Sequence, residues 1–179
     1  MNGLLTLARW IDALNERVGR ATTWLVLLAT LISAGNALAR YLLSDSSNAW
    51  LEIQWYLFGA IFLLGAGYTL KHNGHVRIDI VYGRFGKRGQ AWIDLLGGLF
   101  FLLPFAVLLA WLAWPMFIDA WRTLEHSPDS GGLLRWPVKL LLPVGFALLA
   151  LQGIAEIIKR IGVLTGYYAM HDEKPAEEF

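Results

Sequence analysis

The sequence predicts an all-α integral membrane protein with four transmembrane helices. Hydrophobic residues make up 56% of its 179 residues and charged residues only 16%, whereas soluble domains carry about 25% charged residues. With nine tryptophans and nine phenylalanines, a soluble domain of this length would expose a large, aggregation-prone apolar surface. Four long apolar stretches, each near the roughly 20 residues that a helix needs to cross a bilayer, complete the argument.

The four spans are expected over residues 21–43, 50–70, 91–117 and 137–158. Each is uncharged over most of its length, namely over residues 21–39, 53–70, 95–117 and 140–155. The segments between them are polar and rich in Gly, Ser and Pro, so the spans form one membrane domain over residues 21–161, followed by a tail over 162–179. Pro104 interrupts the third span, where a single proline typically produces a kink.

Residues 1–20 are expected to form an amphipathic helix that lies in the membrane interface. Apolar residues recur at helical spacing on one face of this segment, Trp10 lies beside them, and charged residues occupy the other face. A helix packed on a partner protein is the alternative. Cleavage as a signal peptide after Ala37-Leu38-Ala39 is not expected, because a signal peptide begins with a positively charged segment and this one carries the acidic residues Asp12 and Glu16.

The distribution of positive charge predicts the orientation. Lys and Arg number 11 on the side of the two termini and the middle loop and 4 on the other side, so both termini are expected in the cytoplasm. Residues 71–88 carry five of these cations and are expected to contact anionic phospholipid headgroups or a partner's loop. A net charge of +1 without a basic cluster excludes a nucleic-acid partner.

Tryptophans lie near the predicted span ends, as expected of residues that anchor a helix in the headgroup region. Trp111 is the exception, because it lies within the third span and is expected to face lipid or a partner. The expected anchors are Trp10, Trp24, Trp50, Trp55, Trp92, Trp114, Trp121 and Trp136.

The polar residues considered in the first two spans lie near the same rim of the membrane. Arg40 and Glu52 flank a short loop and are expected to form an ion pair, or else to reach water separately. Asn36 and Gln54 are amides, which commonly join neighbouring spans by hydrogen bonds. No series of acids crosses the membrane, so a proton relay is not expected.

Catalytic chemistry is not expected, and neither is a cofactor. Cysteine is absent, and His72 and His75 stand without a clear third metal ligand. The turn-rich segment 127–132 contains serines but follows no predicted strand, so it is not a nucleophile elbow.

Three sequence blocks resemble the small permease subunit of TRAP transporters, the DctQ-like family. Glu52 is followed by Leu57-Phe58-Gly59 and Leu64-Gly65-Ala66-Gly67-Tyr68. The block Asn73-Gly74-His75-Val76-Arg77-Ile78-Asp79-Ile80-Val81 follows and is the most specific. Ser127-Pro128-Asp129-Ser130-Gly131-Gly132, Trp136-Pro137 and Leu142-Pro143-Val144-Gly145 complete a likeness that covers residues 21–161.

The resemblance implies a membrane subunit that does not carry substrate itself. Such subunits act as a scaffold for a DctM-like large permease, which holds the sodium sites, while a periplasmic binding protein delivers an organic acid. The location implied is the bacterial inner membrane, with multiple passes. Glu52, His75, Arg77 and Asp79 match the family pattern and are expected, with Arg40 and Gln54, to make structural or subunit contacts.

Two other functions are weighed against this one. An autonomous four-span transporter or channel would need internal repeats or ionisable residues at mid-membrane depth, and the sequence has neither. A membrane enzyme would need His or acidic residues converging at one membrane face, and only His72 and His75 approach that pattern.

Overall fold

The computed structural model describes residues 1–43, 47–75 and 82–167. They include four helical stretches that are long and apolar enough to cross a membrane. These are α1 (Asn2–Leu43), α2 (Asn48–Lys71), the continuous stretch Lys87–Arg122, and α6 (Trp136–Leu164). The described part of the chain forms no strand beyond a single bridge between His126 and Leu134. The predicted fold class, an all-α protein with four membrane-length helices, is confirmed.

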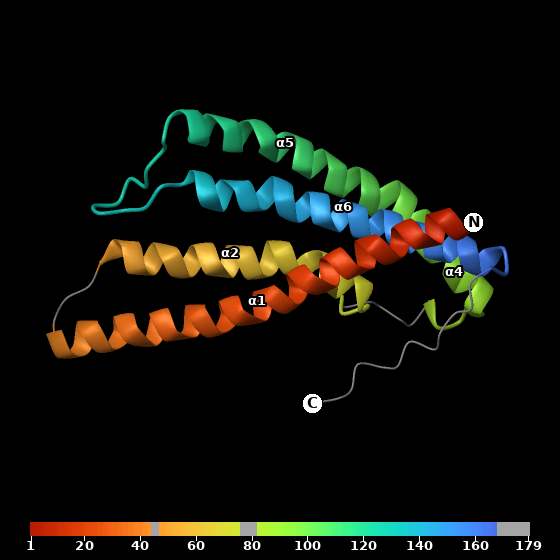
Figure 1. The fold of residues 1–179 in the computed structure, drawn as a ribbon, viewed down its shortest axis with the longest axis horizontal. Helices are drawn as coiled ribbons and strands as arrows, with labels where there is room; N and C mark the ends of the chain where they lie inside the picture. Colours follow the sequence, from red (N-terminus) through yellow and green to blue (C-terminus); the bar gives the residue numbers. More distant parts are fainter. Residues whose placement is uncertain (44–46, 76–81, 168–179) are drawn as a thin grey trace.

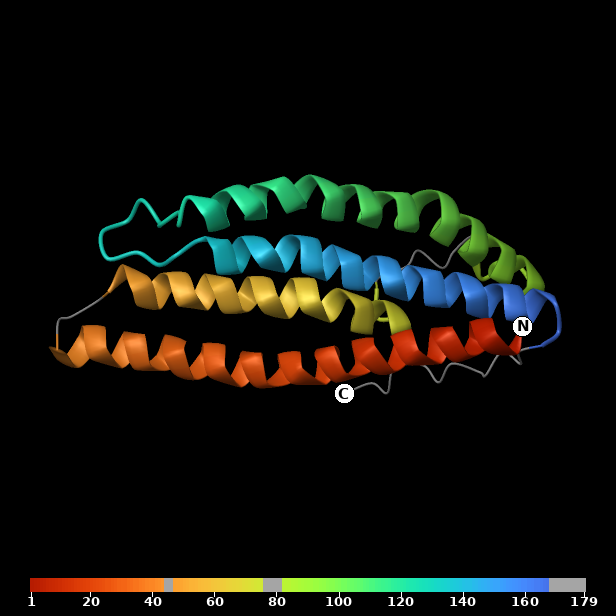
Figure 2. The same cartoon turned by 45° about the horizontal axis from the view of Figure 1, so that its top comes forward.

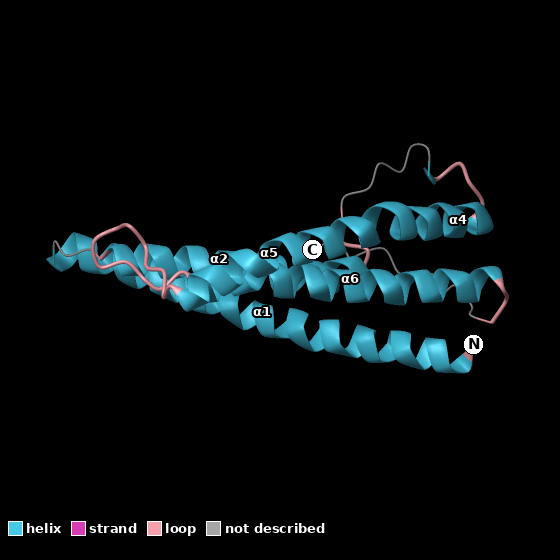
Figure 3. Cartoon of the chain, turned by 90° about the horizontal axis from the view of Figure 1, so that it is seen from above, coloured by secondary structure: helices cyan, strands magenta, loops and turns pink. Residues whose placement is uncertain are grey.

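The long helices lie side by side in the order α5, α6, α2, α1 (Figure 2). The hairpin of residues 123–135, the end of α1 and the start of α2 lie at one end of this row, which we call the hairpin end (Figure 1). The opposite end holds the start of α1, the end of α6 and α4, and we call it the α4 end. Seen from above, α4 lies on the side of α6 away from α1 (Figure 3).

The first helix is unbroken from Asn2 to Leu43. Residues 1–20 are therefore helical, but they do not form the separate helix expected there. No proline lies between Asn2 and Leu43, so every residue near the expected boundary can donate its backbone N–H to the helix. At the boundary itself, the Thr22 hydroxyl donates to the Gly19 carbonyl within the helix. Part of the apolar face is also covered, because Ala8 and Ile11 pack against α6. The location of this half in the membrane interface stays a prediction.

The third span contains the interruption expected at Pro104. It consists of α4 (Lys87–Gly97), the π-helical turn η1 (Gly98–Leu102) and α5 (Leu103–Arg122). Proline has no N–H to donate, and its ring clashes with the carbonyl four residues earlier, here that of Phe100. The wider π turn, which ends at Leu102, makes room for the proline ring and for the missing hydrogen bond.

Small residues bring the helices together. A Cβ placed on Gly145 of α6 would lie 2.8 Å from the backbone oxygen of Leu63 in α2. One placed on Gly67 of α2 would lie 2.2 Å from Oδ1 of Asn15 in α1. Gly35 is different, because nothing lies within 4 Å of a Cβ built there. Among the described residues, a close approach of two helices is thus present at Gly67 and absent at Gly35.

Candidate functional site

A buried amide pair joins α1 to α6. The Nδ2 of Asn15 donates to Oε1 of Gln152 at 3.0 Å, and both residues are 0% exposed. The Nε2 of Gln152 donates in turn to Oδ1 of Asp12 at 2.7 Å and to Oε1 of Glu156 at 3.0 Å. The amide of Gln152 therefore connects a buried amide of α1 with one carboxylate from each helix.

Lys159 completes this α1–α6 polar cluster, which we define as Asp12, Asn15, Gln152, Glu156 and Lys159. Its Nζ lies 3.3 Å from Oδ1 of Asp12 and 2.5 Å from Oε1 of Glu156. Charged groups removed from water are stable only when they are paired and hydrogen-bonded. The cluster meets this condition with one ammonium between two carboxylates, and it fixes the first half of α1 on α6.

A third helix reaches the cluster at Asn15. The Oδ1 of Asn15 is buried and accepts no hydrogen bond from the described residues. It lies against Gly67 of α2, where any side chain would collide with it. Buried polar atoms without partners are rare, and this one lies where Asn15 of α1 contacts both α2 and α6.

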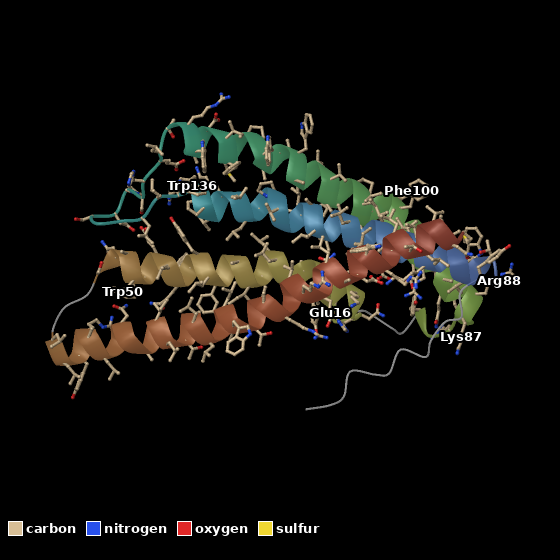
Figure 4. All side chains as sticks on the ribbon, viewed as in Figure 1. Glu16, Trp50, Lys87, Arg88, Phe100 and Trp136 are labelled. Carbon is tan, nitrogen blue, oxygen red and sulfur yellow. The ribbon has the colours of Figure 1, made fainter. Side chains whose placement is uncertain are left out.

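An ion cluster at the end of α2 joins α1 to α2. The carboxylate of Glu16 lies 2.7 Å from Nζ of Lys71, 2.8 Å from Nε2 of His72 and 2.9 Å from Nε of Arg20. Figure 4 shows Glu16 where α1 passes the end of α2. The ring centroids of His72 and Tyr68 lie 4.3 Å apart, with the two rings tilted by 41°. In the described ranges, no group of three or more His, Cys, Asp or Glu could hold a metal ion.

At the other end, α2 holds the hairpin of residues 123–135 by three hydrogen bonds. The backbone N–H of Leu133 donates to Oε2 of Glu52 at 2.7 Å. The hydroxyl of Tyr56 donates to the Leu134 carbonyl at 3.1 Å, and Nδ2 of Asn48 donates to the Ser130 carbonyl at 3.1 Å. Side chains from the first turns of α2 therefore fix the path of the hairpin.

The hairpin is also closed from within. The N–H of Arg135 donates to the Glu125 carbonyl at 2.8 Å, and the Glu125 carboxylate pairs with Lys139 and Arg135. The hydrogen bond from Lys139 is the main cause that holds the pKa of Glu125 below its ordinary value of 4.5. The ionised form of Glu125 is therefore the one that stabilises the hairpin.

The ion pair expected between Arg40 and Glu52 does not form. Glu52 instead accepts from the backbone of the hairpin, while Arg40 is exposed and has no ion-pair partner among the described residues. Gln54 does not join two spans either, because its Nε2 donates to the carbonyl of Trp50 one turn earlier in its own helix. Asn36 lies at the α1–α2 boundary without a hydrogen bond in the described part of the chain.

The sequence block from residue 73 is only partly described. His75 is exposed at the end of the turn that follows α2. Arg77 and Asp79 lie outside the described residues. Subunit contacts by these three residues stay predictions.

Most of the tryptophans expected as anchors are exposed, but Trp24 lies near the middle of α1 rather than at a helix end. Figure 4 shows Trp50 and Trp136 at the hairpin end and Lys87 and Arg88 at the α4 end. Trp136 is half-buried against Trp121, with ring centroids 4.6 Å apart. Trp111 is 76% exposed within α5. Anchoring in lipid headgroups stays a prediction for all of them; those exposed are Trp10, Trp24, Trp50, Trp55, Trp92, Trp114 and Trp121.

A family model for the DctQ component of tripartite ATP-independent periplasmic transporters matches residues 29–162, about three quarters of the chain. The chain belongs to the DctQ family. It is the small component of such a transporter, which implies a large DctM permease and a binding protein as partners. Four membrane-length helices agree with a multi-pass membrane protein. No curated protein and no solved structure matches the chain.

The hydrogen bonds and ion pairs of the α1–α6 polar cluster were not predicted from the sequence of this DctQ component. Asp12 and Asn15 lie before the region that the family model matches, whereas Gln152 and Lys159 lie inside it. A usable signal is the position of Gln152, an amide within an uncharged stretch of the fourth span. A polar group at such a position needs a partner, although the sequence does not say which.

Proposed function

We propose that this DctQ component is a scaffold subunit that supports the large permease and carries no substrate itself. The large permease would perform sodium-coupled transport, and a periplasmic binding protein would deliver an organic acid to it. The assembly would lie in the bacterial inner membrane. The 11-to-4 distribution of Lys and Arg supports a periplasmic hairpin end and a cytoplasmic α4 end.

One observation carries the proposal, namely the depth at which charged residues lie. The central parts of the four spans, over residues 21–39, 53–70, 95–117 and 140–155, contain no Asp, Glu, Lys, Arg or His. The ion pairs described above all join residues that lie outside these stretches. Pathways for ions or acids need polar or ionisable groups at mid-depth. A helical wall with its polar contacts near its rims suits a support for a neighbouring permease.

Co-purification tests the proposal. The tagged chain is co-expressed with its candidate large permease, solubilised in mild detergent and purified through the tag. We expect a stable complex of both proteins. When a large permease from a different TRAP system is co-expressed instead, we expect it not to co-purify with the tagged chain. Recovery of the tagged chain alone, in detergents that keep it folded, would contradict the proposal.

A further inference from the structure

A groove opens between α1 and α2 at the hairpin end. It encloses about 410 Å³ and is lined by Leu31, Ile32, Gly35, Asn36 and Ala39 of α1 and by Trp50 of α2, among others. No residue of α1 beyond Ala29 is fully buried, and Ile32, Asn36 and Ala39 are half-buried, so the described residues cover the last turns of α1 only in part. We call this space the α1–α2 groove.

The α1 wall of the groove is suited to a close helix contact. Gly35 and Ala39 are four residues apart and therefore lie one above the other on the same face. Pairs of small residues at this spacing let membrane helices approach closely. Among the described residues nothing uses the opportunity, because none of their atoms lies within 4 Å of a Cβ built on Gly35.

Two polar side chains on this side of α1 make no hydrogen bond or ion pair with the described residues. Asn36 lines the groove, and Arg40 follows one turn later, about 6 Å along the axis. Neither makes a hydrogen bond or an ion pair with any residue that the structure describes. Asn36 belongs to the uncharged part of the first span, where an unsatisfied amide costs several kcal/mol. A lipid acyl chain has no group that could satisfy it.

We infer that the α1–α2 groove binds a transmembrane helix of the large permease. This inference rests on the function proposed above and names the surface through which it acts. The bound helix presents a hydrogen-bonding side chain to Asn36 and, one turn nearer the hairpin end, an acidic side chain to Arg40. A small residue at the crossing point lets it approach Gly35 and Ala39.

Charge argues against a second copy of this chain as the occupant. Both copies would cross the membrane in the same direction, so a symmetric contact through this groove would place the two Arg40 side chains at the same depth. Like charges at close range are unfavourable. A partner with an acid at this depth is complementary instead.

Two identical substitutions on opposite faces of α1 test the inference. Ala39 lines the groove, whereas Ala37 is exposed and lies about 160° away around the helix. We expect Ala39→Leu to lower recovery of the large permease about tenfold or more, because a larger side chain overfills a close helix contact. Ala37→Leu should leave recovery unchanged, and both purified variants should unfold at the temperature of the unsubstituted chain. Equal recovery with both variants would overturn the inference while leaving the proposed function intact.

Alkylation of a single introduced thiol gives a readout that does not depend on a bulky side chain. The chain contains no cysteine, so Ala39→Cys and Ala37→Cys each provide one reactive thiol of nearly the original size. We expect N-ethylmaleimide to react with the thiol at position 39 in the isolated subunit but not in the complex, with little change at position 37. Protection of position 39 by a second copy of the chain, or by phospholipid alone, would overturn the inference. If the unsubstituted chain binds no large permease, the proposed function itself fails.

Discussion

Gln152 joins α1 to α6 through its side-chain amide. It contacts Asn15 and Asp12 of α1 as well as Glu156 of its own helix, and all three contacts are hydrogen bonds of 3.0 Å or less. Truncation would remove the bond between the helices at the buried Asn15 amide and would leave Lys159 as the remaining partner of the two carboxylates. Buried groups that lose a partner cost more than a hydrogen bond contributes.

We expect Gln152→Ala to lower the free energy of unfolding in detergent by about 1–3 kcal/mol. A double-mutant cycle with Asn15→Ala should give a coupling near 0.6 kcal/mol, the average for interhelical hydrogen bonds in membranes. Additive effects, with no coupling between the two substitutions, would show that the pair does not interact. Gln54→Ala is the control, because that amide bonds only within its own helix.

Glu52 has a more local task, which is to hold the hairpin. We expect Glu52→Ala to make the Leu133 amide exchange with deuterium about tenfold faster or more, because a charge-assisted hydrogen bond is lost. Hydrogen–deuterium exchange with peptide-level resolution measures this directly. Unchanged exchange at residue 133, or equal acceleration in Gln54→Ala, would be inconsistent with the anchoring role.

Glu125 makes the stability of the hairpin end depend on pH. Because its pKa is lowered in the folded protein, its contribution is present above the ordinary carboxyl pKa of 4.5 and is lost as the pH falls through the lower, folded value. We expect the unfolding temperature of the unsubstituted chain to exceed that of Glu125→Gln at pH 7, and the gap to close below about pH 4.5. A gap of constant size across this range would rule out the pairing with Lys139 as its cause.

Among the helices, α2 and α6 depend on glycine for their contact. A methyl group on Gly145 would meet the backbone of Leu63, so the two helices would have to separate. We expect Gly145→Ala to lower the free energy of unfolding by about 1–3 kcal/mol, the usual cost of overpacking. Gly97→Ala is the matched control in open space and should be neutral or stabilising by up to about 1 kcal/mol. Similar losses from both substitutions would point to a general intolerance of side chains rather than to this contact.

The elements themselves could be predicted from the sequence, because the apolar length of a span is a local property. The spans expected over 50–70 and 137–158 lie within α2 and α6, and the interruption at Pro104 lies beside η1. The expected boundary near residue 20 fails for a physical reason. Amphipathicity changes there, but no residue stops the helix, and α6 offers a surface on which the first half of α1 continues.

Polar pairing could not be predicted in the same way, because it depends on how each helix is rotated and tilted. Arg40 and Glu52 are close in sequence, yet Glu52 contacts a hairpin 81 residues away. Asn15 and Gln152 are 137 residues apart and meet only because α1 packs on α6. Of the residues that make these contacts, only Glu52 was a candidate from the sequence, and its partner in the hairpin could be found only from the fold.

As a whole, the molecule is a wall of helices rather than a closed bundle around a pathway. The row α5, α6, α2, α1 leaves many large apolar side chains of the described residues exposed, as expected of helices that face lipid or another subunit. Its polar contacts hold neighbouring helices together and fix one hairpin. This arrangement is consistent with a rigid support for a permease.

Uptake driven by a sodium gradient tests the central claim most directly. Proteoliposomes would hold this chain alone, the candidate large permease alone, or both, with the binding protein and the radiolabelled organic acid that it retains added outside. The account predicts no uptake by this chain alone and rapid uptake only when both membrane proteins are present. Sodium-dependent uptake by this chain alone would contradict it.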